Sequence, residues 1–371
     1  MVNVIYFAAV HVLALVVAPL WGVFVGFSVW AWLLAGLIWL FSGLSITAGY
    51  HRLWSHRSYR ASWSLKLFFI VFGTFSLQNS VLVWCARHRA HHRFVDDIER
   101  DPHSIRAGFW HAHIGWMLRD RPGAEVDFDY VPDLMADPLL RWQHKYYFPL
   151  TWLLNLGVPA LIGFLLGEVI GMVLLAGAVR LVFSQHCTFF INSLAHMWGR
   201  RQYSHENSSR DNGWLALLTW GEGYHNFHHA FQTDYRNGRR WWHFDPGKWL
   251  IASCAALGLA SQLKRTPAFK IQRARVRMQF HQLENELCAD EMDDTWARTI
   301  EHEYQQFKDT VSQWQAVQGE RVKAGTAALS DRWPTHALRA RFRELDQQLK
   351  DQAARLANLQ KKWQANRRGS A

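Results

Sequence analysis

Long uncharged stretches alternate with polar ones along the chain. The first 50 residues contain no Asp, Glu, Lys or Arg, and Arg52 is the first charged residue. A helix needs about 20 apolar residues to cross a bilayer, so this stretch predicts two membrane spans, with the bend expected at Pro19-Leu-Trp-Gly22. A second pair of spans is predicted over 148–190, with Glu168 near the bend and Arg180 inside the second arm.

Two further apolar segments are ambiguous. Segment 65–85 is long enough to cross, but Lys66, Gln78 and Asn79 make both of its ends polar. If it crossed, the histidines that follow it would lie on the opposite side of the membrane from those that follow the first pair of spans. We therefore expect it to lie along the membrane surface, and we expect the shorter segment 250–263 to be an interfacial or core helix.

Beyond residue 264 the chain becomes rich in Glu, Gln, Arg, Lys and Ala, and its apolar residues are spaced for amphipathic helices. The predicted fold class is therefore all-α: a polytopic membrane protein with four transmembrane helices in two hairpins, a cytosolic helical cap that holds a histidine-rich di-metal site, and a soluble helical C-terminal tail. The predicted domains are a transmembrane hairpin at 1–50, a cytosolic or interfacial histidine region at 51–147, a second hairpin at 148–190, a cytosolic cap at 191–263 and the tail at 264–371.

Composition supports a membrane protein. The chain has 21 Trp and 23 Phe, an aromatic content typical of membrane–water interfaces. The formal net charge of +11 fits a cytoplasmic face and anionic lipids, and we expect no nucleic-acid partner. The four cysteines form no CxxC motif, which argues against a disulfide framework.

Histidines are the chemically distinctive residues, because 20 of them are present and several are clustered. Imidazole is the commonest transition-metal ligand near neutral pH. Three clusters and one further histidine stand out. The first cluster is His51 and His56, after the first pair of spans, and the second is His88, His91 and His92, after segment 65–85. The third is His225, His228 and His229, and the further histidine is His196, four residues after Asn192. We interpret His103 and the other scattered histidines as surface or core residues, or as neighbours of the site.

The spacing of the clusters predicts two metal ions. Positions i, i+3 and i+4 share one face of a helix, so each three-histidine cluster presents three rings that two neighbouring ions can divide. His51 and His56 would lie about 140° apart on an ideal α-helix, so we expect the helix to end or unwind between them. Nine histidines are too many for one zinc ion, which takes three or four protein ligands, and two redox-active irons fit the number better. Arginines flank the clusters, which favours the cytoplasmic side.

The motifs His51-Arg-Leu-Trp-Ser-His56, His88-Arg-Ala-His91-His92, Asn192-Ser-Leu-Ala-His196 and His225-Asn-Phe-His228-His229 lie in this order between paired spans. The chain thereby resembles the stearoyl-CoA (delta-9) desaturases of the integral-membrane fatty acid desaturase family. The resemblance implies a cap over four spans and a kinked tunnel for an acyl chain. It implies nine metal ligands, His51, His56, His88, His91, His92, His196, His225, His228 and His229, with Asn192 acting through water.

The resemblance also suggests residues around the metals. Those that would bind substrate are Gln78, Asn79, Trp84, Arg106 and Thr188. Separately from the resemblance, nearness in sequence to the motifs makes five carboxylates candidates to orient the ligand rings: Asp96, Asp97, Asp101, Glu206 and Glu222. Family members that use acyl-CoA usually have Arg-Asp before the second motif, where this chain has Ala86-Arg87, so acyl-CoA and acyl-lipid both remain open as the long-chain substrate.

The expected reaction inserts a cis double bond, by resemblance at delta-9, using two Fe²⁺ ions, O₂ as co-substrate and two electrons. No dinucleotide fingerprint is present, so we expect no bound flavin or nicotinamide and an external electron carrier, ferredoxin-like or similar, with its own reductase. A membrane di-iron lipid or alkane hydroxylase is the alternative enzyme, and a metal transporter or haem-handling protein is the alternative from another class. A transporter would place ionisable residues inside its spans, whereas here the histidines sit at span ends.

Overall fold

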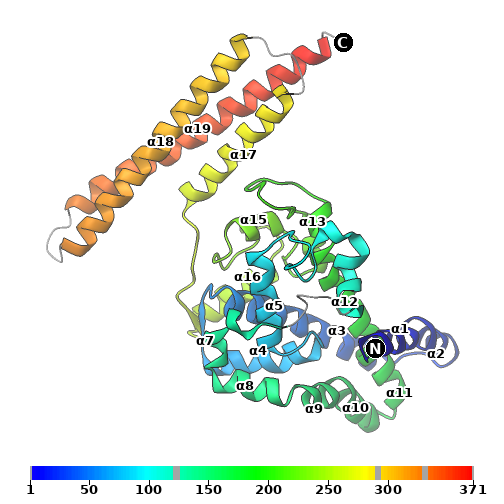
Figure 1. Cartoon of the computed structure of the whole chain (residues 1–371). Coiled ribbons are helices and arrows are strands. Elements are labelled where there is room, and N and C mark those ends of the chain that lie inside the picture. The colour runs from blue at the N-terminus through cyan, green and yellow to red at the C-terminus, as the bar shows by residue number, and fades with distance from the viewer. Residues whose placement is uncertain (1, 120–125, 289–293, 328–332, 370–371) are drawn as a thin grey trace. The chain divides into compact units, whose positions relative to one another are not determined.

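The computed structural model describes residues 2–119, 126–288, 294–327 and 333–369, and the regular structure in them is almost entirely helical (Figure 1). Four stretches are long and apolar enough to cross a membrane: Asn3–Phe24, Val29–Ser55, Tyr147–Leu166 and Val169–Met197. The predicted fold class, all-helical with four spans, is confirmed.

The first two spans differ from expectation at their bend. The elements are α1 (Val2–Val12), the π-helix η1 (Leu13–Val17), α2 (Ala18–Phe24), α3 (Val29–Leu44) and the π-helix η2 (Ser45–Ser55). Pro19 does not reverse the chain, because α1, η1 and α2 form one continuous helix, Asn3–Phe24, and Pro19 lies inside it, two residues after the π-helical turn η1. The chain instead reverses after Phe24, where Gly26 adopts a φ of +88° and Ser28 caps α3 by accepting the N–H of Ala31.

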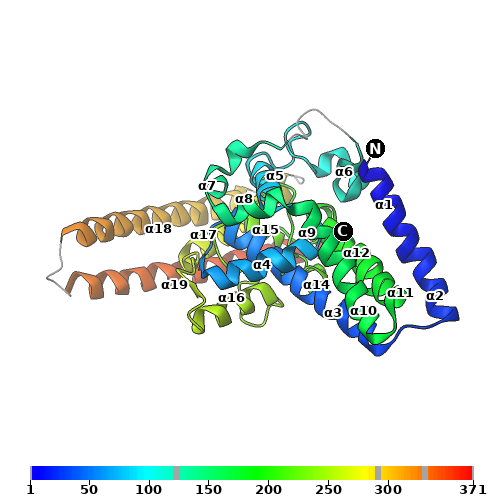
Figure 2. The same cartoon turned by 90° about the horizontal axis from the view of Figure 1, so that it is seen from below.

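The second pair of spans turns where the sequence predicted. Its elements are α9 (Tyr147–Trp152), the π-helix η6 (Leu153–Gly157), α10 (Val158–Leu166), α11 (Val169–Met172), the π-helix η7 (Val173–Val179), α12 (Arg180–Asn192) and α13 (Leu194–Met197). Gly167 ends α10 in the left-handed conformation, and the carboxylate of Glu168 accepts the N–H of Ser28 at 3.0 Å. The two turns are thus joined, and α12 lies along α3 (Figure 2).

Segment 65–85 does not form a single helix long enough to cross a membrane, which agrees with the expectation that it is not a span. It forms two helices, α4 (Trp63–Phe75) and α5 (Val81–Arg93), separated by a turn in which Leu77 and Asn79 have positive φ. Each of the two helices has 13 residues and is too short to span. Ser62 and Ser80 cap them by accepting the N–H groups of Leu65 and Val83.

Short elements connect these helices and form the rest of the cap. The 3₁₀ and π turns are η3 (Ile105–Ala107), η4 (His111–Gly115) and η5 (Phe128–Tyr130). The helices are α6 (Trp116–Leu118), α7 (Pro132–Met135), α8 (Pro138–Lys145), α14 (Gly213–Leu218), α15 (His225–Ala230) and α16 (Pro246–Ala256). Strand β1 (Arg60–Ala61) pairs antiparallel with β2 (Ala260–Ser261). The largest core cluster joins η2, α4, α5 and α16.

The chain divides into two compact units, and the second comprises Arg201–His205 with Thr266–Ala371. It contains α17 (Ala268–Cys288), α18 (Asp294–Ala327) and α19 (Trp333–Gly369), with α18 and α19 side by side and α17 against α19 (Figure 1). Its core includes Phe280, Phe307 and Leu349. This unit begins two residues after the predicted boundary at 264 and is helical, as the amphipathic spacing indicated.

Candidate metal centre

The histidines come from four elements at the end of the spans. His51 lies in η2, and His56 is the residue directly after η2. The second half of α5 carries His88, His91 and His92. His196 lies in α13, and α15 carries the remaining three, His225, His228 and His229. The first half of α5 is anchored by the buried residues Val81, Leu82 and Cys85. The histidine half therefore projects from a firmly packed base.

The winding of η2 brings His51 and His56 together. A π-helix pairs residues five apart, and the N–H of His56 donates to the carbonyl of His51 at 3.1 Å. Their ring centroids are 4.8 Å apart. The helix winds more widely than an α-helix here and ends after Ser55, so it does unwind and end between His51 and His56, as expected.

Five histidines form a first group. Their ring nitrogens lie within 4.8 Å of one another, and the members are His51, His56, His88, His92 and His228. Three Nε2–Nε2 distances are short: 2.9 Å between His51 and His228, 2.8 Å between His56 and His88, and 3.0 Å between His228 and His92.

Four histidines form a second group, again with ring nitrogens within 4.8 Å: His91, His196, His225 and His229. The Nε2 of His225 lies 3.1 Å from that of His196 and 3.0 Å from that of His229. Both α5 and α15 therefore divide their histidines between two groups, as the spacing predicted. The structure brings all nine predicted ligands together and adds a tenth histidine, His103, whose ring lies 4.4 Å from that of His91.

Burial keeps these rings neutral. His88, His92, His225, His228 and His229 have pKa values well below the usual histidine range, first because burial disfavours the charged form and then because neighbouring histidines repel it. A neutral imidazole keeps a lone pair for a cation. The clusters are therefore suited to metal binding across the physiological pH range.

Carboxylates orient two of the rings from behind. The Nδ1 of His91 lies 2.9 Å from Asp101, and the Nδ1 of His51 lies 2.9 Å from Glu222. Burial alone would raise the pKa of Glu222, but His51 and Arg52 lower it to about 2, so the group is a carboxylate. A ring that donates through Nδ1 presents its Nε2 lone pair to the interior of the group.

The other orienting candidates lie elsewhere. Asp96 acts indirectly, because it accepts hydrogen bonds from the amide and hydroxyl of Ser208, whose oxygen lies 2.7 Å from His196 Nδ1. Asp97 instead pairs with Arg100 at the surface, and Glu206 is exposed.

Sequence reasoning missed three supporting residues, Ser208, Arg52 and Asp245. Arg52 and Asp245 form a buried charge network with the predicted Glu222, in which Arg52 lies 2.9 Å from Asp245 and 3.1 Å from Glu222. Arg52 is 1 % exposed. Its position inside the first histidine motif was the only feature of the sequence that could have linked it to the site. Nothing in the sequence linked Asp245 or Ser208 to the site.

The lone-pair arrangement fits metal ions better than hydrogen bonds between rings. In a neutral His51 ring whose Nδ1 proton faces Glu222 at 2.9 Å, Nε2 carries a lone pair and cannot donate to His228. The same holds for a neutral His91 ring whose Nδ1 proton faces Asp101 at 2.9 Å. Converging Nε2 lone pairs repel one another unless a cation lies among them, so the donor set fits two nitrogen-ligated metal ions.

Asp211 supports the third histidine cluster. It accepts the N–H of Phe227 at 3.0 Å in the first turn of α15, and burial raises its pKa to about 7. The folded protein then keeps this proton between about pH 4 and 7, where the unfolded chain has lost it, so this group's contribution to stability falls as pH rises.

Replacing Asp211 with Asn is expected to remove this loss while keeping the acceptor oxygen. The variant gains about 2–3 kcal/mol over the original chain at pH 8 relative to pH 5, because the loss runs over about two pH units up to the pKa of about 7 and each unit is worth about 1.4 kcal/mol. Thermal unfolding at both pH values measures it, with Asp129→Asn at an exposed site as control. An equal change at both pH values contradicts the assignment.

Three of the substrate candidates meet one another. The amide of Gln78 donates to Thr188 Oγ1 at 2.9 Å, and the indole of Trp84 donates to Gln78 Oε1 at 3.3 Å. Trp84 also stacks on His88, with ring centroids 4.8 Å apart. This trio therefore connects the first histidine group with α12.

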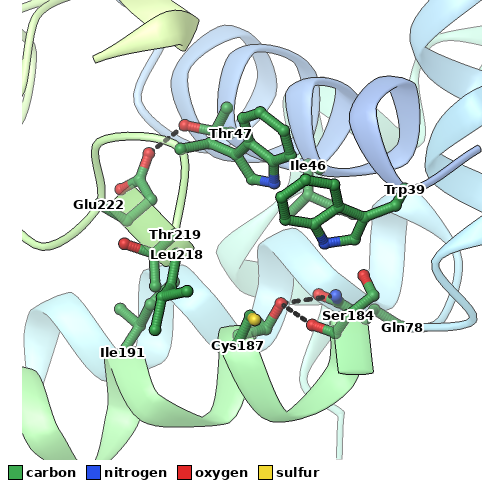
Figure 3. Close-up of a pocket in the computed structure, with 13 residues that line it drawn as sticks. Trp39, Ile46, Thr47, Gln78, Ser184, Cys187, Ile191, Leu218, Thr219 and Glu222 are labelled. Atoms are coloured by element: carbon green, nitrogen blue, oxygen red, sulfur yellow. Dashed lines mark hydrogen bonds between the residues drawn. The ribbon is translucent and has the colours of Figure 1, made fainter. Parts of the chain in front are cut away.

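Gln78 and Thr188 line a narrow pocket that also reaches Glu222 (Figure 3). Its walls come from α3, η2, α12 and the turn after α14, and its remaining lining residues are Trp39, Gly43, Ile46, Thr47, Ser184, Cys187, Ile191, Leu218, Thr219 and Trp220. Trp39 and Trp220 are in contact, with ring centroids 4.5 Å apart. A slot with mostly apolar walls thus leads to the carboxylate behind His51.

The other candidates lie outside this pocket lining. The N–H of Asn79 donates to the Tyr147 hydroxyl at 2.9 Å, and Arg106 is exposed in η3. Asn192 is the last residue of α12 and is half-buried. Its contact with a metal through water stays a prediction.

Comparison with known proteins identifies the relatives. Residues 28–262 match the family model described as fatty acid desaturase. Acyl-CoA desaturase 1 of Saccharomyces cerevisiae is 43 % identical over 239 residues, which cover 64 % of this chain and 46 % of that protein. Stearoyl-CoA desaturase 5 of Homo sapiens is 40 % identical over 246 residues, covering 64 % and 73 %. The sn-2 palmitoyl-lipid 9-desaturase of Nostoc is 36 % identical over 277 residues, covering 72 % and 90 %. The chain spans about half the length of acyl-CoA desaturase 1 of Saccharomyces cerevisiae and of the probable acyl-CoA desaturase of Schizosaccharomyces pombe.

Proposed function

The chain belongs to the fatty acid desaturase family, and from this membership and the two histidine groups we propose that it is a membrane enzyme that inserts a cis double bond, at delta-9, into a long-chain saturated acyl substrate. The observation that carries the proposal is the convergence of nine histidines, seven buried and two half-buried, into two groups in a chain with four candidate membrane spans. The protein is an integral membrane protein.

Two Fe²⁺ ions are the proposed cofactor, one in each group, with His51, His56, His88, His92 and His228 around the first and His91, His196, His225 and His229 around the second. No side chain can remove hydrogen from an unactivated methylene, and iron with O₂ supplies the oxidising power that this requires. The all-nitrogen surroundings favour a soft-to-borderline transition metal over Mg²⁺ or Ca²⁺.

The chain's own residues position the reacting groups. Asp101, Glu222 and Ser208 hold three ligand rings in fixed orientations, and the buried network of Arg52 and Asp245 fixes Glu222 in turn. The pocket beside them excludes water from an acyl chain and sets which carbon lies nearest the histidines. The position of the double bond then follows from orientation.

The end of the pocket beside Gly43, Trp39 and Trp220 is proposed to limit the length of the acyl chain that can bind. A Cβ added at Gly43 would overlap the Trp220 indole, so the space there is already filled. Trp39→Ala is expected to open it and to shift products towards longer chains, because each newly buried methylene contributes about 0.8 kcal/mol. Analysis of products from a mixed-length substrate pool measures the shift, and Trp39→Phe is the matched control. An unchanged profile contradicts the placement of the acyl chain in this pocket.

The substrate carrier is proposed to be either coenzyme A or a lipid, since the named relatives include both an acyl-CoA and a palmitoyl-lipid desaturase. We further propose that the histidine side faces the cytoplasm, because arginines such as Arg57, Arg93 and Arg100 gather there. This basic face would accept an acidic external electron carrier, served by a separate reductase.

The test is to supply acyl-CoA and phospholipid substrates in parallel to purified, iron-reconstituted protein with a reducing system, and to locate new double bonds by mass spectrometry. A cis double bond at carbon 9 in one substrate class is the expected result. Incorporation of oxygen into the chain would indicate a hydroxylase instead, and no conversion of either substrate by iron-loaded protein would contradict the proposal.

A further inference from the structure

Two exposed tryptophans stand on a short loop before α16. Trp241 is 80 % exposed and Trp242 is 56 % exposed. The exposed Arg240 beside them places its guanidinium 5.1 Å from the centre of the Trp242 ring. Large aromatic surface left open to solvent is costly in a soluble environment, and such surface commonly marks an interaction site.

The loop is held rigidly in this position. The ammonium group of Lys248 donates to three loop carbonyls, those of Gly238 at 2.9 Å, Arg240 at 2.8 Å and His243 at 3.2 Å. The indole of Trp249 also donates to the Trp241 carbonyl at 3.4 Å. The exposure of the two rings is therefore a feature of the fold and is present before any partner arrives.

The surface beside the loop is uncharged and continues onto a membrane span. After Lys248 the next charged residue is Lys264, and Trp249 on α16 and Leu257 directly after it are exposed. Helix α16 contacts α3, the second span. A charge-free face that adjoins a spanning helix, and that is bordered by basic residues, fits the boundary between hydrocarbon and headgroups.

The loop is also connected to the first histidine group. The Oδ2 of Asp245 accepts the N–H of Gly238 at 2.9 Å, and its Oδ1 lies 2.9 Å from Arg52. Arg52 then lies 3.1 Å from Glu222, whose other oxygen lies 2.9 Å from Nδ1 of His51. Four buried links therefore join the loop backbone to one proposed ligand.

We propose that the loop Arg239–Trp242 is a membrane anchor that seats in the headgroup layer on the histidine side, with Trp241 and Trp242 at the acyl boundary and Arg240 on the phosphate of an anionic phospholipid. Indole rings favour this layer, and guanidinium groups bind phosphate well. Seating the loop supports Asp245 and hence the orientation of His51. This last consequence rests on the proposed metal function, whereas the seating itself does not.

Spin labels placed in lipid nanodiscs containing anionic lipid test the seating directly. With Cys288 replaced by Ser, labels at Trp241→Cys and Leu257→Cys are compared with one at Glu99→Cys, an exposed acidic site. Collisions with dissolved oxygen should exceed those with a water-soluble nickel complex at 241 and 257, and the reverse should hold at 99. A water-like pattern at 241 overturns the proposal, even if 257 lies in lipid. If the label at 241 becomes inaccessible to the nickel complex only after an acidic electron carrier is added, the loop would be assigned to protein docking instead.

The coupling to His51 has its own readout. Trp241→Ser combined with Trp242→Ser should release bound metal to a chelator several-fold faster than the original chain in nanodiscs, whereas Trp214→Ser, at a 74 % exposed site on α14, should not. Equal release rates in all three proteins would disprove the coupling without affecting the spin-label result.

Discussion

Replacing His228 with alanine is expected to abolish desaturation, with turnover more than ~100-fold lower. His228 is 1 % exposed, and its Nε2 lies 2.9 Å from that of His51 and 3.0 Å from that of His92, so it is central to the first histidine group. Loss of a residue that only orients a ligand costs 10–100-fold in metal affinity or activity, and loss of a ligand should cost at least the upper end of that range.

The measurements are product formation and metal content of the same purified sample. The expected sample retains one metal ion or fewer per chain and an unchanged helical signal in circular dichroism. His302→Ala, at an exposed position on α18, is the control and should keep both metal and activity. Full activity of the His228 variant would contradict the assignment of the first group.

Glu222→Gln is expected to have the second largest effect, on both metal affinity and stability. Its carboxylate contacts His51 and Arg52 and also accepts from Asn237 at 2.7 Å. Glutamine keeps the size but removes the charge that compensates buried Arg52. Breaking a buried ion pair costs about 3–5 kcal/mol, and because Asp245 still contacts Arg52, the lower end of this range is expected.

Metal affinity should fall about 10–100-fold in the same variant, since the His51 ring loses its anionic partner. Thermal unfolding and competition with a chelator measure the two effects. Lys350→Gln removes an ion pair with Asp346 in which Lys350 is 54 % exposed, and it should change stability by less than about 1 kcal/mol. A Glu222→Gln variant as stable and as metal-rich as the original would show that this network does not support the site.

The sequence predicted the parts of the fold that depend on local composition. Stretches with few or no charges identified the four spans, and the polar ends of 65–85 correctly indicated that it is not a single spanning helix. The predicted bend at Pro19 was wrong, because the helix continues through Pro19 to Phe24 and the reversal depends on Gly26 and Ser28. Hydrophobicity alone does not distinguish these positions.

The candidate site was predictable where one helix turn carries several ligands. The spacing in α5 and α15 indicated two groups, and the structure assembles them. The supporting residues Ser208 and Asp245 could not be found in this way, because they lie 12 and 194 residues away from the side chains they support, His196 and His51, and meet them only through the tertiary fold. The π-helical winding of η2 was equally hidden, since nothing in the residues of 45–55 distinguishes it from an α-helix.

The central claim is that the two histidine groups each hold one iron ion. A crystal of iron-reconstituted protein, with diffraction data collected on both sides of the iron absorption edge, tests this directly. The account predicts two anomalous peaks per chain, one among the rings of His51, His88 and His228 and one among those of His91, His196 and His225. A single peak, or peaks outside these groups, would contradict it.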